Sequence, residues 1–395
     1  MEITMYNVEF GDCFVINDNN NLVVDFGIHP DCLKFSSTNR NSIHQDISLD
    51  LYKLSSPELL LTHYHQDHYS GLLYMMSNFQ KRRFKNMYIP DVWDVGQGRD
   101  TVTLLLLEDL MKDAYIYDSS NQKKESLLTL AEFICGKTNV IPVKKGSFMC
   151  GTKYKVLWPD TKKIFSHANE LMNGIEDKYN NSKKALSILS GIAVRLIECV
   201  NFINSDGSVS VEIKELWVEL NKFNQENKDL LDDLKEEYEP ILNYFGNEIS
   251  VVFHNSESRK DKVGRPNNIL FTGDIPAKYM QDIMDNGDLY TFTKDDGYKV
   301  IKIPHHGTQG FSNNLYYFDF TSICDPQIVL IPNGNNGNPA CKITSSYLSL
   351  CNNRNVYCSN CNFCNNFNYN KTPKCQCGYK TNKIVYHTKV IKFSI

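Results

Sequence analysis

The stretch Leu-Leu-Leu-Thr-His-Tyr-His-Gln-Asp-His-Tyr-Ser-Gly, residues 59–71, carries the strongest chemical signal in this sequence. It opens with three leucines, which predict a buried strand, and then changes at once to imidazole and carboxylate side chains. In an extended loop, alternate side chains share one side, so we expect His63 and His65 to bind one metal ion together. Asp67 and His68 then turn toward a second ion. Nitrogen and oxygen ligands of this kind suit zinc, and also manganese or iron.

The His-x-His-x-Asp-His pattern resembles the signature of the metallo-β-lactamase fold. That resemblance implies an α/β protein, an αββα sandwich, with three further signals in a set order. They are an upstream strand ending in Asp, a downstream strand ending in Asp and a last strand ending in His. The sequence has all three, namely Asp25 after the strand pattern of 22–24, Asp274 after that of 268–273, and His305 after that of 298–304.

The same resemblance implies a role for each of these residues. Asp25 is expected to hold the loop of residues 63–68, here called the metal loop, by hydrogen bonds rather than by ligation. Asp274 is expected to bridge two ions. His305 is expected to bind the second ion, because the first residue past a strand end keeps the direction of the strand. His306 then points to the opposite side, toward the leaving group, where it is a candidate proton donor.

An ordered set of shorter motifs resembles one branch of the fold, the domain of the ComEC DNA-uptake proteins and its stand-alone relatives. The resemblance covers most of residues 3–160 and 247–395. The matching pieces are Asn7-Val8-x-x-Gly11-Asp12-Cys13, Val24-Asp25-x-Gly27, His63 to Gly71, Val156-Leu157-Trp158-Pro159, Asn247-x-x-Ser250-Val251-Val252, Leu270-x-Thr272-Gly273-Asp274 and Ile303-Pro304-His305-His306-Gly307-Thr308.

This branch implies a phosphodiester substrate, DNA above all, hydrolysed by a hydroxide that two zinc or manganese ions share. Asp67 would anchor the second ion and be essential for turnover. The basic runs 81–85 and 259–265 offer phosphate contacts, or else they are solvated surface. The family also suggests DNA processing or phage defence. Hydrolysis of a small phosphodiester or nucleotide is an alternative, and so is a metal-binding interaction subunit of a larger complex.

The sequence departs from the family pattern at the first metal position. No histidine occurs between His68 and His167, so the usual third histidine ligand is missing. Asp160, His167, His254 or water is an open substitute. The family also often has His-Pro where this chain has Asn338-Pro339.

The domain organisation follows from these matches. Residues 1–159 and 247–395 form the expected catalytic domain, with a strand at 248–254, a helix near 344–351 and a last strand at 383–395. Residues 160–246 read as a helical insertion that governs assembly, as a homodimer or with a partner protein, or substrate access. Packing of these helices on their own core is the alternative.

Five cysteines near the C-terminus predict a separate structural zinc site within residues 358–377. Four thiolates complete a tetrahedral shell, which leaves one cysteine spare. Coincidental cysteines in an asparagine-rich loop are the alternative. The cysteines are Cys358, Cys361, Cys364, Cys375 and Cys377.

Composition sets the remaining limits. Hydrophobic residues make up 42% of the 395 residues, which is typical of a globular chain. A net charge of −4 excludes a global positive field toward nucleic acid but not a local basic groove. Residues 185–203, the most apolar helix-like run, are interrupted by Arg195 and Glu198, which favours a buried helix over a membrane span. We see no signal peptide and expect a cytoplasmic protein whose 13 cysteines are thiols or metal ligands.

Overall fold

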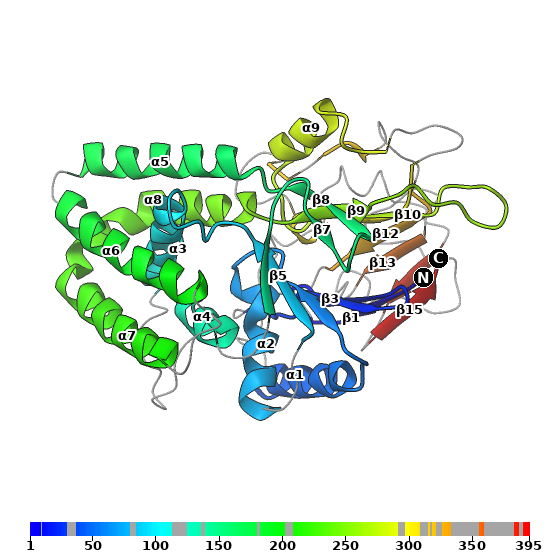
Figure 1. Cartoon of the computed structure of the whole chain (residues 1–395), viewed down its shortest axis with the longest axis horizontal. Coiled ribbons are helices and arrows are strands. Elements are labelled where there is room, and N and C mark those ends of the chain that lie inside the picture. Colours follow the sequence, from blue (N-terminus) through cyan, green and yellow to red (C-terminus); the bar gives the residue numbers. More distant parts are fainter. Residues whose placement is uncertain are drawn as a thin grey trace.

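The computed structural model of this chain is a mixed α/β structure in which two β-sheets are flanked by helices (Figure 1). It describes residues 1–8, 10–29, 37–79, 84–112, 125–135, 139–179, 182–201, 208–290, 297–308, 315–316, 318–320, 326–332, 355–358, 383–386 and 390–395.

The first sheet has antiparallel strands at one end and parallel strands at the other. The parallel half begins where the third strand of the chain pairs with the strand of the leucine run. The seven strands lie in the order β15 (Val390–Ser394), β1 (Glu2–Tyr6), β2 (Phe14–Asn17), β3 (Asn21–Val24), β4 (Glu58–Leu60), β5 (Asn86–Pro90) and β6 (Asn139–Val143).

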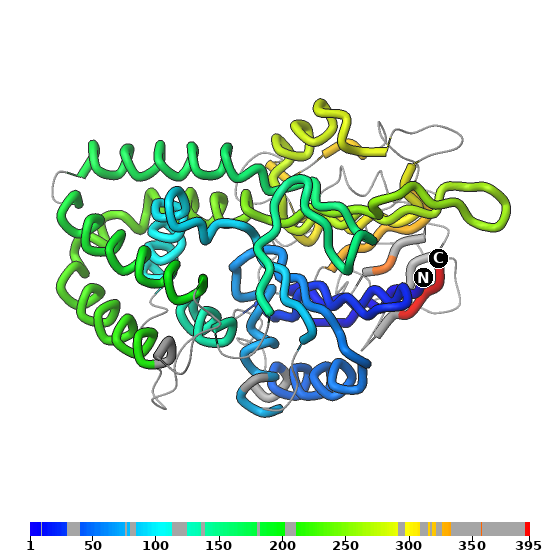
Figure 2. The backbone as a smooth tube through the Cα atoms, viewed as in Figure 1, coloured from blue at the N-terminus to red at the C-terminus, as the bar shows by residue number. Residues whose placement is uncertain are grey.

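The second sheet is also mixed, with its parallel strands at the C-terminal end of the chain. The eight strands lie in the order β14 (Lys383–Tyr386), β13 (Asn355–Cys358), β12 (Ile328–Ile331), β11 (Tyr298–Lys302), β10 (Asn268–Phe271), β9 (Val252–Asn255), β8 (Tyr154–Trp158) and β7 (Phe148–Met149). The predicted final strand at 383–395 is therefore wrong in one respect. It is two strands, β14 in this sheet and β15 in the other, where β15 pairs with β1 and brings the termini side by side (Figure 2).

An apolar layer joins the inner faces of the two sheets. Phe14 of β2 meets Phe271 of β10 with ring centroids 5.3 Å apart, and Phe271 stacks on Phe253 of β9. Tyr357 of β13 stacks on Phe393 of β15 at 4.8 Å. Because alternate residues of a strand face opposite sides, the other residues of the same strands are free to contact helices.

Helices cover the outer faces of both sheets. Figure 1 shows α1 (Ser37–Tyr52) and α2 (Gln66–Asn78) beside the first sheet and α9 (Ala277–Asp285) beside the second. The bonds of Asp25 and Phe26 to the metal loop hold α2 close to the end of β3, since Phe26 N donates to His68 O at 2.8 Å.

Six further helices form a block at one end of the sheets, on the left of Figure 1. At its centre lies α3 (Arg99–Met111), most of whose residues are buried. A helix that is apolar on all sides has no polar face for solvent, so it has to be surrounded by other elements. One continuous apolar core links this block to the outer sheet faces. The helices are α3 (Arg99–Met111), α4 (Leu127–Cys135), α5 (Thr161–Lys178), α6 (Ser182–Asn201), α7 (Ser208–Glu226) and α8 (Lys228–Glu248).

The boundary between α8 and β9 differs from the prediction. The sequence suggested a strand from residue 248, but α8 continues through Glu248 and the strand begins at Val252. The end of α8 therefore lies beside the strand ends rather than in a loop. Within the described residues, no helix is long and apolar enough to cross a membrane. The helix predicted near 344–351 lies outside the described residues.

Candidate metal centre

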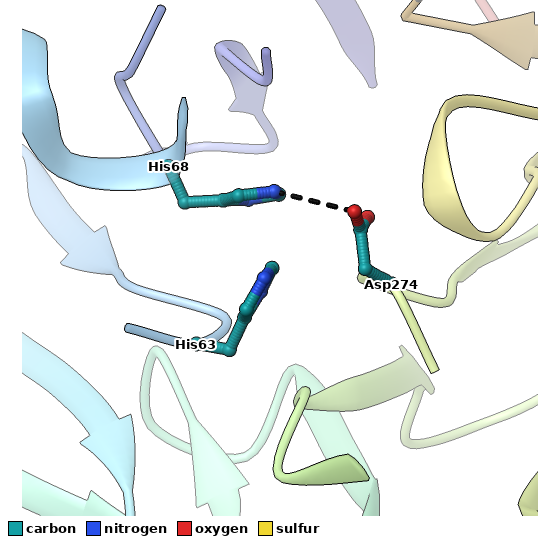
Figure 3. Close-up of side chains that lie close together, drawn as sticks. All are labelled: His63, His68 and Asp274. Atoms are coloured by element: carbon teal, nitrogen blue, oxygen red, sulfur yellow. Dashed lines mark ion pairs between the residues drawn. The ribbon is translucent and has the colours of Figure 1, made fainter. Parts of the chain in front are cut away.

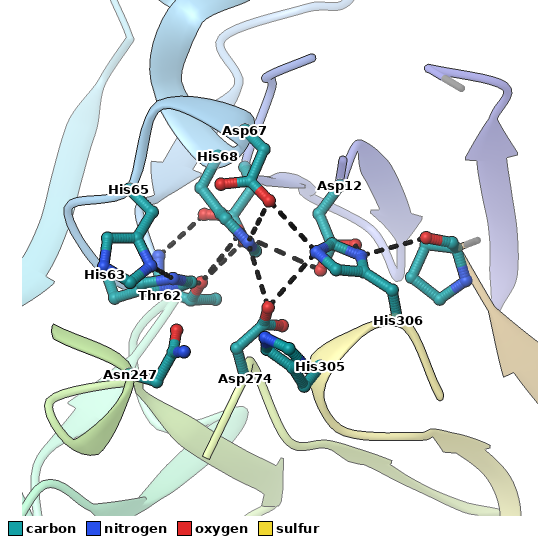
Figure 4. A network of polar contacts seen from close by, with 12 residues as sticks. Asp12, Thr62, His63, His65, Asp67, His68, Asn247, Asp274, His305 and His306 are labelled. Carbon is teal, nitrogen blue, oxygen red and sulfur yellow. Dashed lines mark hydrogen bonds and ion pairs between the residues drawn. The ribbon is translucent and has the colours of Figure 1, made fainter. Parts of the chain in front are cut away.

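Most of the predicted histidine and aspartate ligands come together at the carboxyl ends of parallel strands from both sheets (Figure 4). Asp25 follows β3, His63 follows β4, and Asp274 follows β10. Asp67 and His68 lie in the first turn of α2, which begins directly after the loop. All of these side chains except His65 are buried or nearly so, and His65 is partly buried.

His68 is oriented by a carboxylate on one side and faces carboxylates on the other. Its Nδ1 donates to Asp25 Oδ2 at 2.8 Å, so the Nε2 lone pair points into the site. That Nε2 lies 3.5 Å from Asp274 Oδ2 and 3.9 Å from Asp67 Oδ2, and it has no hydrogen-bond partner among the described residues. Figure 3 shows His68 and His63 turned toward Asp274.

His306 repeats this arrangement from the second sheet. Its Nδ1 donates to the carbonyl oxygen of Pro332 at 2.9 Å, which again directs Nε2 inward. His306 Nε2 lies 3.1 Å from Asp67 Oδ2 and 3.2 Å from Asp274 Oδ2. Two imidazoles thus present Nε2 atoms to the same pair of carboxylate oxygens.

Lone pairs that face carboxylates repel them unless a proton or a cation lies between. Burial lowers the pKa values of His68 and His306, but Asp274 and the neighbouring carboxylates outweigh burial and raise both pKa values well above the ordinary range. Burial raises the pKa values of Asp67 and Asp274, but the two imidazoles, joined at Asp274 by Lys302, outweigh it and lower both well below the ordinary range. The buried cluster therefore requires positive charge, and a divalent cation fits it.

His63 and His65 form a second, less charged position. His63 Nε2 lies 3.1 Å from His65 Nδ1, so the two nitrogens converge as their spacing predicted. Burial, followed by the charges of His68 and His65, holds the pKa of His63 well below its usual value. On the far side of the ring, His65 Nε2 lies 3.3 Å from Glu108 Oε1, which orients it. The ligand atoms of His63, His68 and Asp274 also lie within 4.8 Å of one another.

Asp25 holds the metal loop by hydrogen bonds. Thr62 donates to its carboxylate twice, from the backbone nitrogen and from Oγ1, each at 2.7 Å. Together with the bond from His68, these contacts engage both carboxylate oxygens. Asp25 has a φ of 55°, a left-handed conformation that turns the chain sharply at the end of β3.

Sequence reasoning missed a buried ion pair beside the site. Lys302, the last residue of β11, is 1% exposed, and its Nζ lies 2.7 Å from Asp12 Oδ2 and 3.0 Å from Asp274 Oδ1. It also donates to the carbonyl oxygen of Gly273 at 2.8 Å. One oxygen of Asp274 is thereby taken, which leaves Oδ2 to face the imidazoles. The sequence feature that could have revealed this ion pair is a lysine at an inward-facing position of a buried strand.

The histidine pair after β11 differs from the prediction. Strand alternation does not continue past Pro304, because His305 and His306 have φ values of 46° and 53° and form a tight turn. It is His306, not His305, whose ring nitrogen reaches the carboxylates. His305 stacks on Tyr316 at 3.9 Å, and its Nδ1 lies 2.6 Å from Thr308 Oγ1. Burial lowers the pKa of His305 to about 4.

The candidates for the missing third ligand lie elsewhere. Asp160 caps α5 by accepting from Lys162 N at 3.2 Å. His167 Nδ1 lies 2.6 Å from Glu248 Oε2, and His254 Nδ1 lies 2.8 Å from Tyr298 Oη. None of the three belongs to the groups of converging ligand atoms found among the described residues.

Where the structure describes them, the basic runs and the cysteines that the sequence singled out are not part of this cluster of histidines and aspartates. In the basic run 259–265, Arg259 pairs with Asp18 at 2.6 Å and Arg265 with Asp261 at 3.0 Å, so both guanidinium groups are engaged. Cys358 ends β13. Outside the described residues lie 81–83 of the other basic run, Asn338, Pro339, Cys361, Cys364, Cys375 and Cys377.

Comparison with known proteins adds no relative to this picture. No protein-family model matches the chain, and no curated protein sequence is significantly similar to it.

Proposed function

We propose that this chain is a metal-dependent hydrolase of the metallo-β-lactamase type that cleaves phosphodiester bonds in nucleic acid, with DNA as the first candidate. One observation carries the proposal. The Nε2 atoms of His68 and His306, each oriented through Nδ1 by a separate acceptor, converge on oxygens of Asp67 and Asp274. Such second contacts to Nδ1 are usual for metal-binding histidines.

The architecture supports the same proposal. Two sheets share an apolar inner layer, helices lie on their outer faces, and the ligands follow strands of both sheets. These are the features expected of an αββα sandwich. The site also has the order of strand-end residues along the chain that the motif resemblance implies.

The residues divide into two positions for divalent ions. His63 and His65 would hold the first ion. Asp67, His68 and His306 would hold the second ion. Asp274 would contribute to both positions. Bound ions of this kind act as Lewis acids and lower the pKa of a water ligand toward about 7.

The remaining side chains keep these ligands in place. Asp25 fixes the tautomer of His68, and Lys302 holds Asp274 so that a single oxygen faces the imidazoles. Both ring nitrogens of His306 are engaged, so we no longer assign it the role of proton donor to the leaving group. His305 takes no part in the contacts that join His306 to the carboxylates (Figure 4).

The substrate class depends on the motif resemblance. The paired arginines of residues 259–265 give no support to phosphate binding there, and the fold alone does not select a substrate. The presence of both Asp67 and Asp274 beside the histidines favours a hydrolase over an interaction subunit that has lost its chemistry.

The test combines metal analysis with a substrate panel. The purified protein is stripped with a chelator, reloaded with Mn²⁺ or Zn²⁺, and assayed on single- and double-stranded DNA, RNA, bis(p-nitrophenyl) phosphate and a β-lactam. We expect metal-dependent cleavage of phosphodiesters and none of the lactam. Cleavage that persists in the stripped protein, or a metal-loaded protein that cleaves no phosphodiester, would contradict the proposal.

A further inference from the structure

We infer that Asn247, at the end of α8, completes the His63–His65 position by offering its carboxamide oxygen to the ion. The inference rests on the proposed metal-dependent function and goes beyond it, because it assigns the third protein ligand and the kind of cation that this position prefers.

Three contacts place the segment around Asn247 against the site. Gly246 packs so closely on His65 that a Cβ atom there would lie 2.4 Å from His65 Nε2. Val251 N donates to the carbonyl oxygen of Thr62 at 2.9 Å, directly before His63. Asp274 N donates to Ser250 Oγ at 3.1 Å. The segment is thus tied to His65, to the loop before His63 and to Asp274.

The side chain of Asn247 has its amide nitrogen engaged and its oxygen without a partner. Asn247 is 1% exposed, and its Nδ2 donates to Tyr316 Oη at 2.9 Å. Its Oδ1 is buried and has no hydrogen-bond partner in the part of the chain that the structure describes. Figure 4 shows the carboxamide directed toward His63 and Asp274.

An unpaired buried carbonyl oxygen beside two converging imidazoles is suited to a cation. Buried polar atoms are nearly always paired, and an exception at a site calls for a ligand. An amide oxygen is a harder ligand than a third imidazole, and carbonyl oxygens suit manganese and magnesium better than imidazoles do. The His63–His65 position should therefore accept Mn²⁺ more readily, relative to Zn²⁺, than a site of three histidines.

The experiment measures metal binding to the full chain rather than activity alone. Chelator-stripped wild type, Asn247→Ala, Asn247→Asp and Asn247→His are titrated with Mn²⁺, followed by electron paramagnetic resonance, and with Zn²⁺ in competition. Asn255→Ala is the matched control, because Asn255, at the end of β9, is also fully buried and its Oδ1 accepts a hydrogen bond from Ile269 N at 2.7 Å. Thermal unfolding of the stripped proteins checks that each variant is folded.

We expect Asn247→Ala to weaken the weaker of two Mn²⁺ affinities by about 10-fold or more, the size seen when the shell of a metal site is altered. Asn247→Asp should strengthen it, and Asn247→His should shift the preference toward Zn²⁺ and change the absorption spectrum of the Co²⁺-loaded protein. Asn255→Ala should bind both ions like wild type.

The outcomes separate this inference from the proposed function. If wild type binds no divalent ion, both fail. If wild type binds two ions and cleaves a phosphodiester while Asn247→Ala keeps both affinities, only the inference fails, and the oxygen serves water or substrate. Should Asn247→Ala not fold, an unchanged Mn²⁺ affinity and Co²⁺ spectrum in the aspartate and histidine variants would overturn the inference equally.

Discussion

The two halves of the candidate metal centre are built from different chemistry. The His63–His65 half presents two imidazoles, and burial keeps the pKa of His63 well below its usual value. The half around Asp67 and His306 is rich in carboxylates, and there the pKa values of the imidazoles are raised. Both halves share one loop and one edge of the sheets.

This difference teaches how each half behaves without metal. The carboxylate half satisfies its charge with protons on the imidazoles, so a metal ion must displace protons to enter it. In the imidazole half, burial holds the pKa of His63 well below its usual value, so this ring carries no second proton for a metal ion to displace. Charge also favours tighter binding of a divalent ion in the carboxylate half. The predictions below test this contrast in order of expected effect.

The largest effect should come from Asp67→Asn. This change removes a buried charge whose Oδ2 lies 3.1 Å from His306 Nε2 and keeps the size of the side chain. We expect the ion of the carboxylate half to be lost and turnover to fall by about 10³-fold or more, the upper range for loss of a charge-stabilising group. Metal content by mass spectrometry and steady-state rates test this, and a variant that keeps two ions and full activity would refute it.

The histidine pair gives the next effect. His306→Ala should lower metal content and turnover together, by about 10²-fold or more in turnover. His305→Ala should retain the metal, because His305 stacks on Tyr316 at 3.9 Å instead of facing the carboxylates. The two variants control for each other, being adjacent and alike in size. Metal loss in His305→Ala with normal metal content in His306→Ala would reverse the assignment.

Lys302→Met tests the ion pair beneath the carboxylate half. Methionine keeps the volume of lysine but leaves Asp12 and the Oδ1 of Asp274 buried without their cation. We expect the stripped protein to lose about 3–5 kcal/mol in its free energy of unfolding, as for a buried pair that loses one partner. Urea unfolding measures it. Wild-type stability in this variant would show that Lys302 is not needed to balance the carboxylates.

Glu108→Gln should affect the imidazole half alone. Burial raises the pKa of Glu108, but Lys112 and then His65 outweigh it and lower that pKa to about 2, so the carboxylate is charged behind the His65 ring. Removal of this charge should weaken the ion at His63 and His65 by about 10-fold, with the other ion unchanged. Stepwise metal titration separates the two. Equal weakening of both ions would contradict the division of the site into halves.

The smallest effect is on the pH dependence of stability without metal. The raised pKa values of His68 and His306 contribute stability that is full below the unfolded value of about 6.5 and is lost as pH rises through the folded values. The lowered pKa values of Asp67 and Asp274 contribute stability that is present above about 4 and is lost as pH falls.

The stripped protein should therefore be most stable between pH values of about 4 and 6.5, and its melting temperature should fall by about 2 °C or more as the pH rises through the folded pKa values of the two histidines. The metal-loaded protein should lose this decline, because the cation replaces the protons. Melting curves from pH 5 to 9, with chelator and with excess Mn²⁺, test it. Identical slopes in both states would show that protons and metal do not compete.

Sequence alone determined the features that depend on local pattern. The leucine run at 59–61 overlaps β4 (Glu58–Leu60), the buried strand before His63, and the hydrophobic patterns before Asp25 and Asp274 form β3 and β10. Side-chain spacing within one short loop is set by a few backbone torsions, so the approach of His63 to His65 follows from adjacent residues. Hydrophobic periodicity and the positions of strand ends depend on neighbouring residues, so they can be predicted from a single sequence.

Tertiary structure decided the residues whose placement depends on distant contacts. His306 rather than His305 faces the carboxylates because the chain turns left-handed after Pro304, and Pro332, directly after β12, holds the ring. Lys302 meets Asp12 only because β11 and the segment after β1 belong to facing sheets. Asn247 lies at the site because the end of α8 packs on His65 and the segment after it bonds to the loop before His63. Each depends on packing between segments far apart in the chain, which local periodicity does not specify.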